Sequence, residues 1–124
     1  MPATANRKRP AVEHEAPLDQ ERLLELVSGD ASLLRELVAL AQRELPGITH
    51  ALRLTIGSGD TRTVGSAAHQ LKGALSNLGA GPALALARRM EDAAVSGDLQ
   101  AVCENLAPLE RAMAELQLAL EQVG

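Results

Sequence analysis

The chain has 124 residues, which suits one domain with one hydrophobic core. Hydrophobic residues make up 46% of it, but Phe, Tyr and Trp are absent, so the core must be built from aliphatic residues and Met, a composition that favours an all-α fold. The net charge of -4, the single cysteine and the lack of a long apolar run argue against a nucleic-acid partner, a disulfide framework and membrane insertion, and they favour a cytoplasmic protein.

Residues 1–17 are predicted to form a disordered tail, or a linker from a longer parent protein. They contain three prolines, the basic run Arg7-Lys8-Arg9 and no apolar periodicity, so they cannot bury enough surface to offset the entropy lost on ordering. The basic run could contact nucleic acid or a membrane, but a solvated linker is the better interpretation. Residues 18–124 are predicted to form a helical-bundle domain.

A recurring tripeptide divides this domain into helices: Ser28-Gly29-Asp30, Ser58-Gly59-Asp60 and Ser96-Gly97-Asp98. Gly adopts the left-handed conformation that closes one helix, and Asp caps the first amide groups of the next. A fourth break, Gly79-Ala80-Gly81-Pro82, combines a helix-ending Gly with a Pro suited to a first helical turn. Together the breaks predict helices over 19–27, 31–56, 61–78, 82–96 and 99–122.

Apolar residues at helical spacing run along two of the longer predicted helices. They are Leu34, Leu37, Val38, Ala41, Leu45, Ile48 and Leu52 in 31–56, and Leu99, Val102, Leu106, Leu109, Met113, Leu116 and Leu120 in 99–122. This spacing is typical of near-parallel helices, so we predict an antiparallel four-helix core with a short N-terminal helix. Pro46 and Pro108 leave the stripes in phase, which predicts kinks rather than breaks. Cys103 adjoins the last stripe and is predicted to be buried.

The helix predicted over 61–78 contains the candidate functional residues. Its core stripe consists of Val64, Ala68, Leu71, Leu75 and Leu78, and its opposite face holds Arg62, Gly65, His69, Lys72, Gly73 and Ser76. Gly65 and Gly73 lie four residues before and after His69, although a mid-helix Gly costs about 1 kcal/mol relative to Ala. We expect the two glycines to clear both flanks of the imidazole for a partner. Lys72 would place an ammonium group near any charge on the ring.

From these positions alone, both a functional His69 and an ordinary surface histidine remain open. His14 in the tail and His50 off the apolar stripe have no such glycine neighbours and are interpreted as ordinary. The chain has neither a Gly-rich nucleotide loop nor metal-ligand spacing, so we expect no ATP binding and no metal site.

The string His69-Gln70-Leu71-Lys72-Gly73-Ala74-Leu75-Ser76-Asn77-Leu78-Gly79-Ala80 resembles the signature of histidine-containing phosphotransfer (HPt) domains. In that signature a His is followed by Leu-Lys-Gly and then by Asn-Leu-Gly-Ala. The resemblance extends over roughly 18–122, and Glu44-Leu45-Pro46, Gly59-Asp60 and Met90-Glu91 look like further family segments. The chain departs from the family at Ala41, where Phe is frequent, and at Ala74-Leu75, where two small residues are frequent; these departures concern packing rather than the histidine.

The resemblance implies a phosphorelay intermediate in two-component signalling. His69 would accept a phosphoryl group from a receiver-domain aspartate and pass it to another receiver aspartate. Lys72 would stabilise the phosphate and Gly65 and Gly73 would give steric access. The surface on which the receiver docks would consist of Arg62, Gln70 and Ser76.

The resemblance also implies a monomeric phosphocarrier rather than an enzyme. Its partners would be receiver domains of response regulators or of a hybrid sensor histidine kinase, which would supply a divalent metal, so the chain would need no cofactor. Two alternatives stay open. One is a kinase-substrate domain phosphorylated directly by an ATP-binding domain, and the other is a helical interaction domain with an inert histidine.

Overall fold

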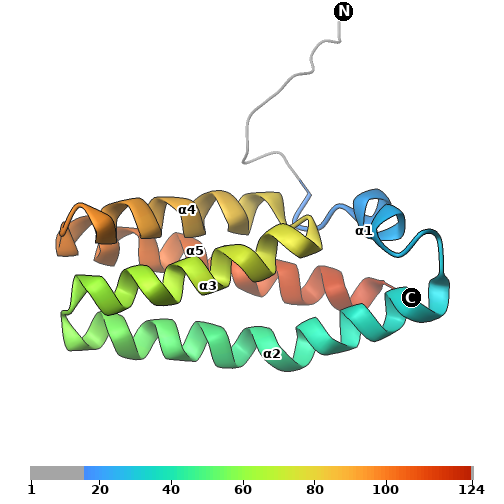
Figure 1. Cartoon of the computed structure of the whole chain (residues 1–124), viewed down its shortest axis with the longest axis horizontal. Helices are drawn as coiled ribbons and strands as arrows, with labels where there is room; N and C mark the ends of the chain where they lie inside the picture. Colours follow the sequence, from blue (N-terminus) through green and yellow to red (C-terminus); the bar gives the residue numbers. More distant parts are fainter. Residues whose placement is uncertain (1–15, 124) are drawn as a thin grey trace, which may run out of the picture.

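The computed structural model describes residues 16–123, which form five helices without any strand (Figure 1). The helices are α1 (Gln20–Leu26), α2 (Ala31–Ser58), α3 (Thr61–Leu78), α4 (Gly81–Val95) and α5 (Leu99–Gln122). The all-α prediction is confirmed; two predicted ranges agree residue for residue, two differ by one residue at each end, and one differs by two residues at its end. Apart from Ala16 and Pro17, the predicted tail lies outside the described residues, and so do its basic run and His14.

The four long helices lie side by side, and short turns at alternating ends make successive helices antiparallel (Figure 1). α3 packs most extensively on α4, α4 packs on α5, and α2 packs on α3. An ion pair between Arg53 and Glu110 also joins α2 to α5. The short α1 lies at the end of the bundle where α3 meets α4, and the Asp19 amide donates a hydrogen bond to the Gly79 carbonyl at 3.1 Å. The predicted antiparallel four-helix core with a short N-terminal helix is therefore confirmed.

The turns have the chemistry that the recurring tripeptide predicts. At the entrance to α3, Gly59 closes α2 in the left-handed region at φ 76°, and the Asp60 carboxylate accepts a hydrogen bond from the Arg62 amide at 3.0 Å. Asp30 and Asp98 cap α2 and α5 in the same way. Since Gly79 turns the chain left-handed at the other end of α3, at φ 67°, α4 returns antiparallel along its neighbour.

The core is aliphatic, and α3 packs into it through the predicted apolar stripe. All five residues of that stripe are buried, and four of them are fully inaccessible to solvent. Pro46 and Pro108 both lie inside uninterrupted helices, so neither ends an element.

Two predictions about α5 are wrong. Cys103 is exposed, because its neighbour Val102 is the residue that points into the core and one helical step of about 100° turns the cysteine away. Leu99 is 37% exposed because it is the first residue of α5, at the end of the bundle, where few neighbours cover it.

Candidate functional site

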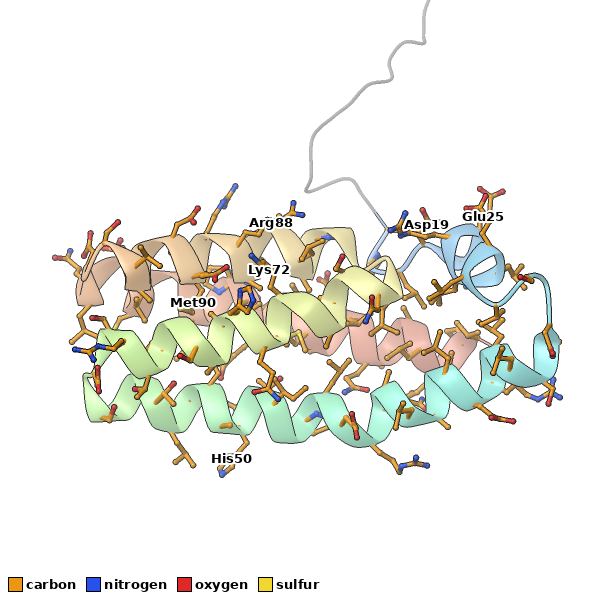
Figure 2. The ribbon with its side chains drawn as sticks, viewed as in Figure 1. Asp19, Glu25, His50, Lys72, Arg88 and Met90 are labelled. Atoms are coloured by element: carbon orange, nitrogen blue, oxygen red, sulfur yellow. The ribbon has the colours of Figure 1, made fainter. Side chains whose placement is uncertain are left out.

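His69 lies in the middle of α3 on the side that faces solvent and α4. The buried stripe fixes the rotation of α3, and Ala68, directly before the histidine, has no exposed surface. The His69 side chain is 69% exposed, so a partner can reach the ring. His50 differs: it projects from the outer side of α2, away from the other helices (Figure 2).

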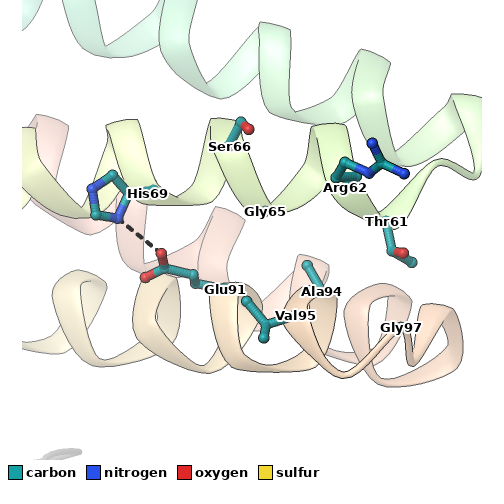
Figure 3. Close-up of a pocket in the computed structure, with 9 residues that line it drawn as sticks. All are labelled: Thr61, Arg62, Gly65, Ser66, His69, Glu91, Ala94, Val95 and Gly97. Carbon is teal, nitrogen blue, oxygen red and sulfur yellow. Dashed lines mark hydrogen bonds and ion pairs between the residues drawn. The ribbon is translucent and has the colours of Figure 1, made fainter.

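A carboxylate from α4 contacts both His69 and Lys72. Glu91 Oε2 lies 2.8 Å from His69 Nδ1 (Figure 3). Glu91 Oε1 lies 2.8 Å from Lys72 Nζ. The preceding residue, Met90, is fully buried, and this contact with the core fixes the rotation of α4 that brings Glu91 to the boundary with α3. The three side chains therefore form a connected cluster across two helices, which we call the His69–Glu91–Lys72 cluster.

The charge on Glu91 determines which ring nitrogen of a neutral His69 carries the proton. The hydrogen bond from Lys72 is the main reason that the pKa of Glu91 lies below its ordinary value; His69 also lowers it, while partial burial opposes the shift. Glu91 is therefore ionised at neutral pH and can only accept hydrogen bonds. The neutral ring must donate from Nδ1, which leaves the lone pair on Nε2, the nitrogen that Glu91 does not contact.

A groove of about 580 Å³ runs from His69 along the boundary between α3 and α4 toward the start of α3. It is lined by Thr61, Arg62, Gly65, Ser66, His69, Glu91, Ala94, Val95 and Gly97 (Figure 3). At Gly65 a methyl group would contact the Ala94 side chain at 3.6 Å, so the glycine keeps this groove open between the helices. Space around Gly73 is open, because a methyl group there would meet no other atom within 4 Å.

The structure brings together some of the residues predicted from the sequence and separates others. Arg62 and Gly65 share the groove with His69, whereas Ser76 lines a different recess between α1 and the start of α4. Gln70 is exposed and lines neither hollow. Lys72, predicted to stabilise a phosphate, is 30% exposed and pairs with Glu91.

Glu91 is the site residue that sequence reasoning missed. The pair Met90-Glu91 was a visible signal, but Glu91 lies 22 residues from His69, and its contact with the ring depends on how α3 and α4 pack. Over residues 16–123, the structure has no cluster of His, Cys, Asp and Glu that could hold a metal ion. Within the same range, no helix is both long enough and apolar enough to cross a bilayer.

Comparisons with known proteins agree with this fold. A model of the Hpt domain family matches residues 32–124, more than half of the chain. Histidine-containing phosphotransfer protein B from Pseudomonas aeruginosa PAO1 has a similar structure, with a TM-score of 0.79 and 24% identity over 86% of this chain and 92% of that one. The HPT domain of a sensor hybrid histidine kinase from Shewanella is also similar, with a TM-score of 0.75 and 20% identity over 87% of this chain and 93% of that domain. No curated protein sequence matches the chain significantly.

Proposed function

Since the chain belongs to the Hpt domain family and has a histidine phosphotransfer role in a two-component phosphorelay, we propose that Nε2 of His69 is the atom that carries the phosphoryl group. The observation that carries this assignment is the hydrogen bond at 2.8 Å between Nδ1 of His69 and Glu91, which leaves Nε2 as the nitrogen with the free lone pair. The exposure of the ring and the groove beside it support the same assignment, because a bulky phosphoryl donor must reach the nucleophile.

The phosphoryl donor is the aspartyl phosphate of a receiver domain docked on α3. Nε2 attacks phosphorus in line with the departing carboxylate, and the reaction depends on positioning and on neutralising charge on the transferred group. Lys72, one turn from His69 on α3, is the cation that can approach the phosphoryl oxygens, while Gly65 and Gly73 leave room for the partner and Arg62 belongs to the surface on which it docks. Gln70 and Ser76 complete the proposed docking surface. In the second half of the relay, another receiver aspartate takes the group from Nε2.

The proposed partners are receiver domains of response regulators or of a hybrid sensor histidine kinase. The receiver supplies the divalent metal and the acidic residues that bind it, so this chain acts as a phosphocarrier without a catalytic site or a cofactor of its own. We expect it to work as a monomer in the cytoplasm.

The test is transfer of labelled phosphate from a receiver domain phosphorylated on its aspartate. The parent protein is expected to take up label in a form stable to alkali and labile to acid, as a phosphoramidate is. His69→Gln, which keeps a polar side chain but has no ring nitrogen, is expected to take up none while remaining helical by circular dichroism. His50→Gln and His14→Gln are the controls and should behave like the parent.

Three results would contradict the proposal. Label that persists in His69→Gln would assign the phosphoryl group to another residue. Label that reaches His69 only from an ATP-binding kinase domain, and never from a phosphorylated receiver, would favour a kinase-substrate domain instead. A histidine that accepts phosphate from neither source would indicate an interaction domain.

A further inference from the structure

A second groove, of about 550 Å³, lies between the end of α1 and the first half of α2 (Figure 1). We call it the α1–α2 groove, and its apolar lining consists of Leu26, Val27, Leu33, Leu37, Ala39 and Leu40. Three of these leucines are between 42% and 56% exposed. Single exposed leucines are ordinary, but leucines gathered in one groove indicate a surface that binds another molecule.

The α1–α2 groove is separate from the groove beside His69. Over the described part of the chain, its lining comes from α1, the residue after α1, and α2, whereas the groove beside His69 is lined by α3, α4 and the turn after α4. A molecule seated in the α1–α2 groove therefore does not cover the histidine. The proposed phosphocarrier role leaves this surface unexplained.

Two opposite charges border the α1–α2 groove. Glu36 and Arg43 both line it and are exposed, and neither forms an ion pair with another described residue. They lie seven residues apart on α2, which is close to two helical turns and about 10 Å along the axis, so they project on the same side of the helix. The groove therefore has an anion toward one end, a cation toward the other and leucine side chains between them.

We propose that the α1–α2 groove binds a second copy of this chain, with the two α2 helices antiparallel about a two-fold axis between Ala39 and Leu40. That point is midway between Glu36 and Arg43, so each Glu36 lies opposite Arg43 of the other copy. A two-fold interface needs a self-complementary surface of this kind, whereas parallel helices would bring like charges together. The inference goes beyond the proposed function and does not depend on it.

The apolar side chains fit the same arrangement. Leu40 meets Leu40 of the second copy at the axis, because it is next to the midpoint. Leu33 lies opposite Pro46 and Gly47 of the second copy, where the space around Gly47 is open. The charged pairs therefore form on either side of an apolar centre.

The pair is expected to be weak. One pair of helical segments of this length falls at the low end of specific interfaces, about 1,200 Å² of buried surface or less. We expect half of the chains to be paired at about 0.1 mM, so single chains predominate in dilute solution and transfer phosphate as monomers. His69 remains accessible in the pair, because its groove lies on other helices.

The experiment measures self-association of the full chain by sedimentation equilibrium from about 10 μM to about 1 mM, with interference optics because the chain has no aromatic residue other than histidine. Glu36→Arg and Arg43→Glu each make both charge contacts repulsive, and each should raise the dissociation constant about tenfold. The double variant Glu36→Arg/Arg43→Glu restores both contacts with their signs exchanged. Its dissociation constant should return to within about threefold of the parent value.

Leu40→Glu places a charge at the axis and should abolish pairing. Leu118→Glu is the matched control, because Leu118 is an exposed leucine of α5 outside the groove, and this variant should pair like the parent. Circular dichroism would check that both variants remain helical.

A parent chain that stays monomeric to about 1 mM, or a double variant that pairs no better than the single variants, would overturn the inference. If Leu40→Glu instead slowed label transfer from a receiver while the parent stayed monomeric, the groove would belong to the receiver's docking surface. His69→Gln should pair like the parent, so a failure of the proposed function would leave this test unaffected.

Discussion

Lys72 is bound to Glu91 in the structure, yet its proposed role is to stabilise a phosphoryl group. The side chain lies one turn from His69 and is 30% exposed, so it can turn from the carboxylate toward the phosphoryl oxygens when these arrive. An interaction of this kind, screened by solvent, is worth about 1 kcal/mol. Lys72→Ala is therefore expected to slow phosphorylation of His69 several-fold without abolishing it, measured as the initial rate of label transfer from a phosphorylated receiver.

The control for Lys72 is Arg111→Ala, which removes an exposed cation from α5 and should leave the rate unchanged. Circular dichroism would check that both variants remain helical. If Lys72→Ala accepted phosphate at the parent rate, Lys72 would have no part in stabilising the transferred group, and its pairing with Glu91 would be purely structural.

The sequence indicated His69 as a functional residue, but it could not indicate that Glu91 contacts the imidazole. His69 stood out because glycines flank it and because the string around it resembles a known signature, and both signals are local. For Glu91 the sequence offered only the family-like pair Met90-Glu91, which does not show that the carboxylate contacts His69, because that contact depends on the pairing of α3 with α4. The wrong prediction for Cys103 has a related cause: Cys103 adjoins Val102 of the apolar stripe, and only the packed rotation of α5 determines whether a residue beside the stripe is buried or exposed.

In α3, the glycine that gives a partner access to His69 also lowers the stability of the helix. Gly73 lies inside the helix with a normal helical φ, and an added methyl group would meet no atom within 4 Å. Gly73→Ala should therefore raise the free energy of unfolding by about 0.5–1 kcal/mol, measured by urea denaturation. Gly73→Phe should leave the helix folded but slow phosphoryl transfer from a receiver several-fold, because the ring would occupy space one turn from His69.

Gly47→Phe is the matched control for this pair of substitutions. Gly47 also lies inside a helix, in α2, with open space around its Cα, and it is remote in sequence from the histidine helix. It should transfer phosphate at the parent rate. A normal rate in Gly73→Phe would show that the partner does not approach over this turn of α3.

The helix boundaries were the most predictable feature of the fold. Each Ser-Gly-Asp tripeptide encodes the end of one helix and the cap of the next within three residues, and the structure places all of those glycines at positive φ. The recess that contains Ser76 was not predictable in this way, because it is formed by residues that are far apart in the sequence: they come from α1, the end of α3 and the first half of α4. A docking surface predicted from the sequence of one helix therefore could not show which of its residues line the same groove as His69.

At the scale of the whole molecule, the cluster that serves the histidine also joins α3 to α4, the most extensively packed pair of helices. The pKa of Glu91 is held below its ordinary value of 4.5, mainly by Lys72. A carboxyl whose pKa is lower in the folded than in the unfolded state adds stability at pH values above 4.5, and that contribution is lost as the pH falls through the folded-state pKa. The free energy of unfolding of the parent should therefore fall on acidification, and Glu91→Gln should lack this part of the decrease.

Urea unfolding followed by far-UV circular dichroism, at pH values on both sides of 4.5, measures this difference. The gap in free energy between the parent and Glu91→Gln should be constant near neutral pH and should narrow in acid. Glu36→Gln, which removes an exposed carboxylate from α2, is the comparison. A gap that widened on acidification would mean that the ionised carboxylate destabilises the pairing of α3 with α4.

The aliphatic core has a practical consequence for watching a partner bind. Because the chain contains no Trp, Tyr or Phe, it has no intrinsic fluorescence and almost no absorbance in the near ultraviolet. In a mixture with a receiver domain, any tryptophan or tyrosine emission therefore belongs to the receiver, and its change on titration reports the complex without a background to subtract. After the amide protons have exchanged in D2O, the aromatic region of this chain's proton NMR spectrum likewise contains only the rings of the three histidines, so the ring of His69 can be followed in the unmodified protein while a deuterated partner approaches.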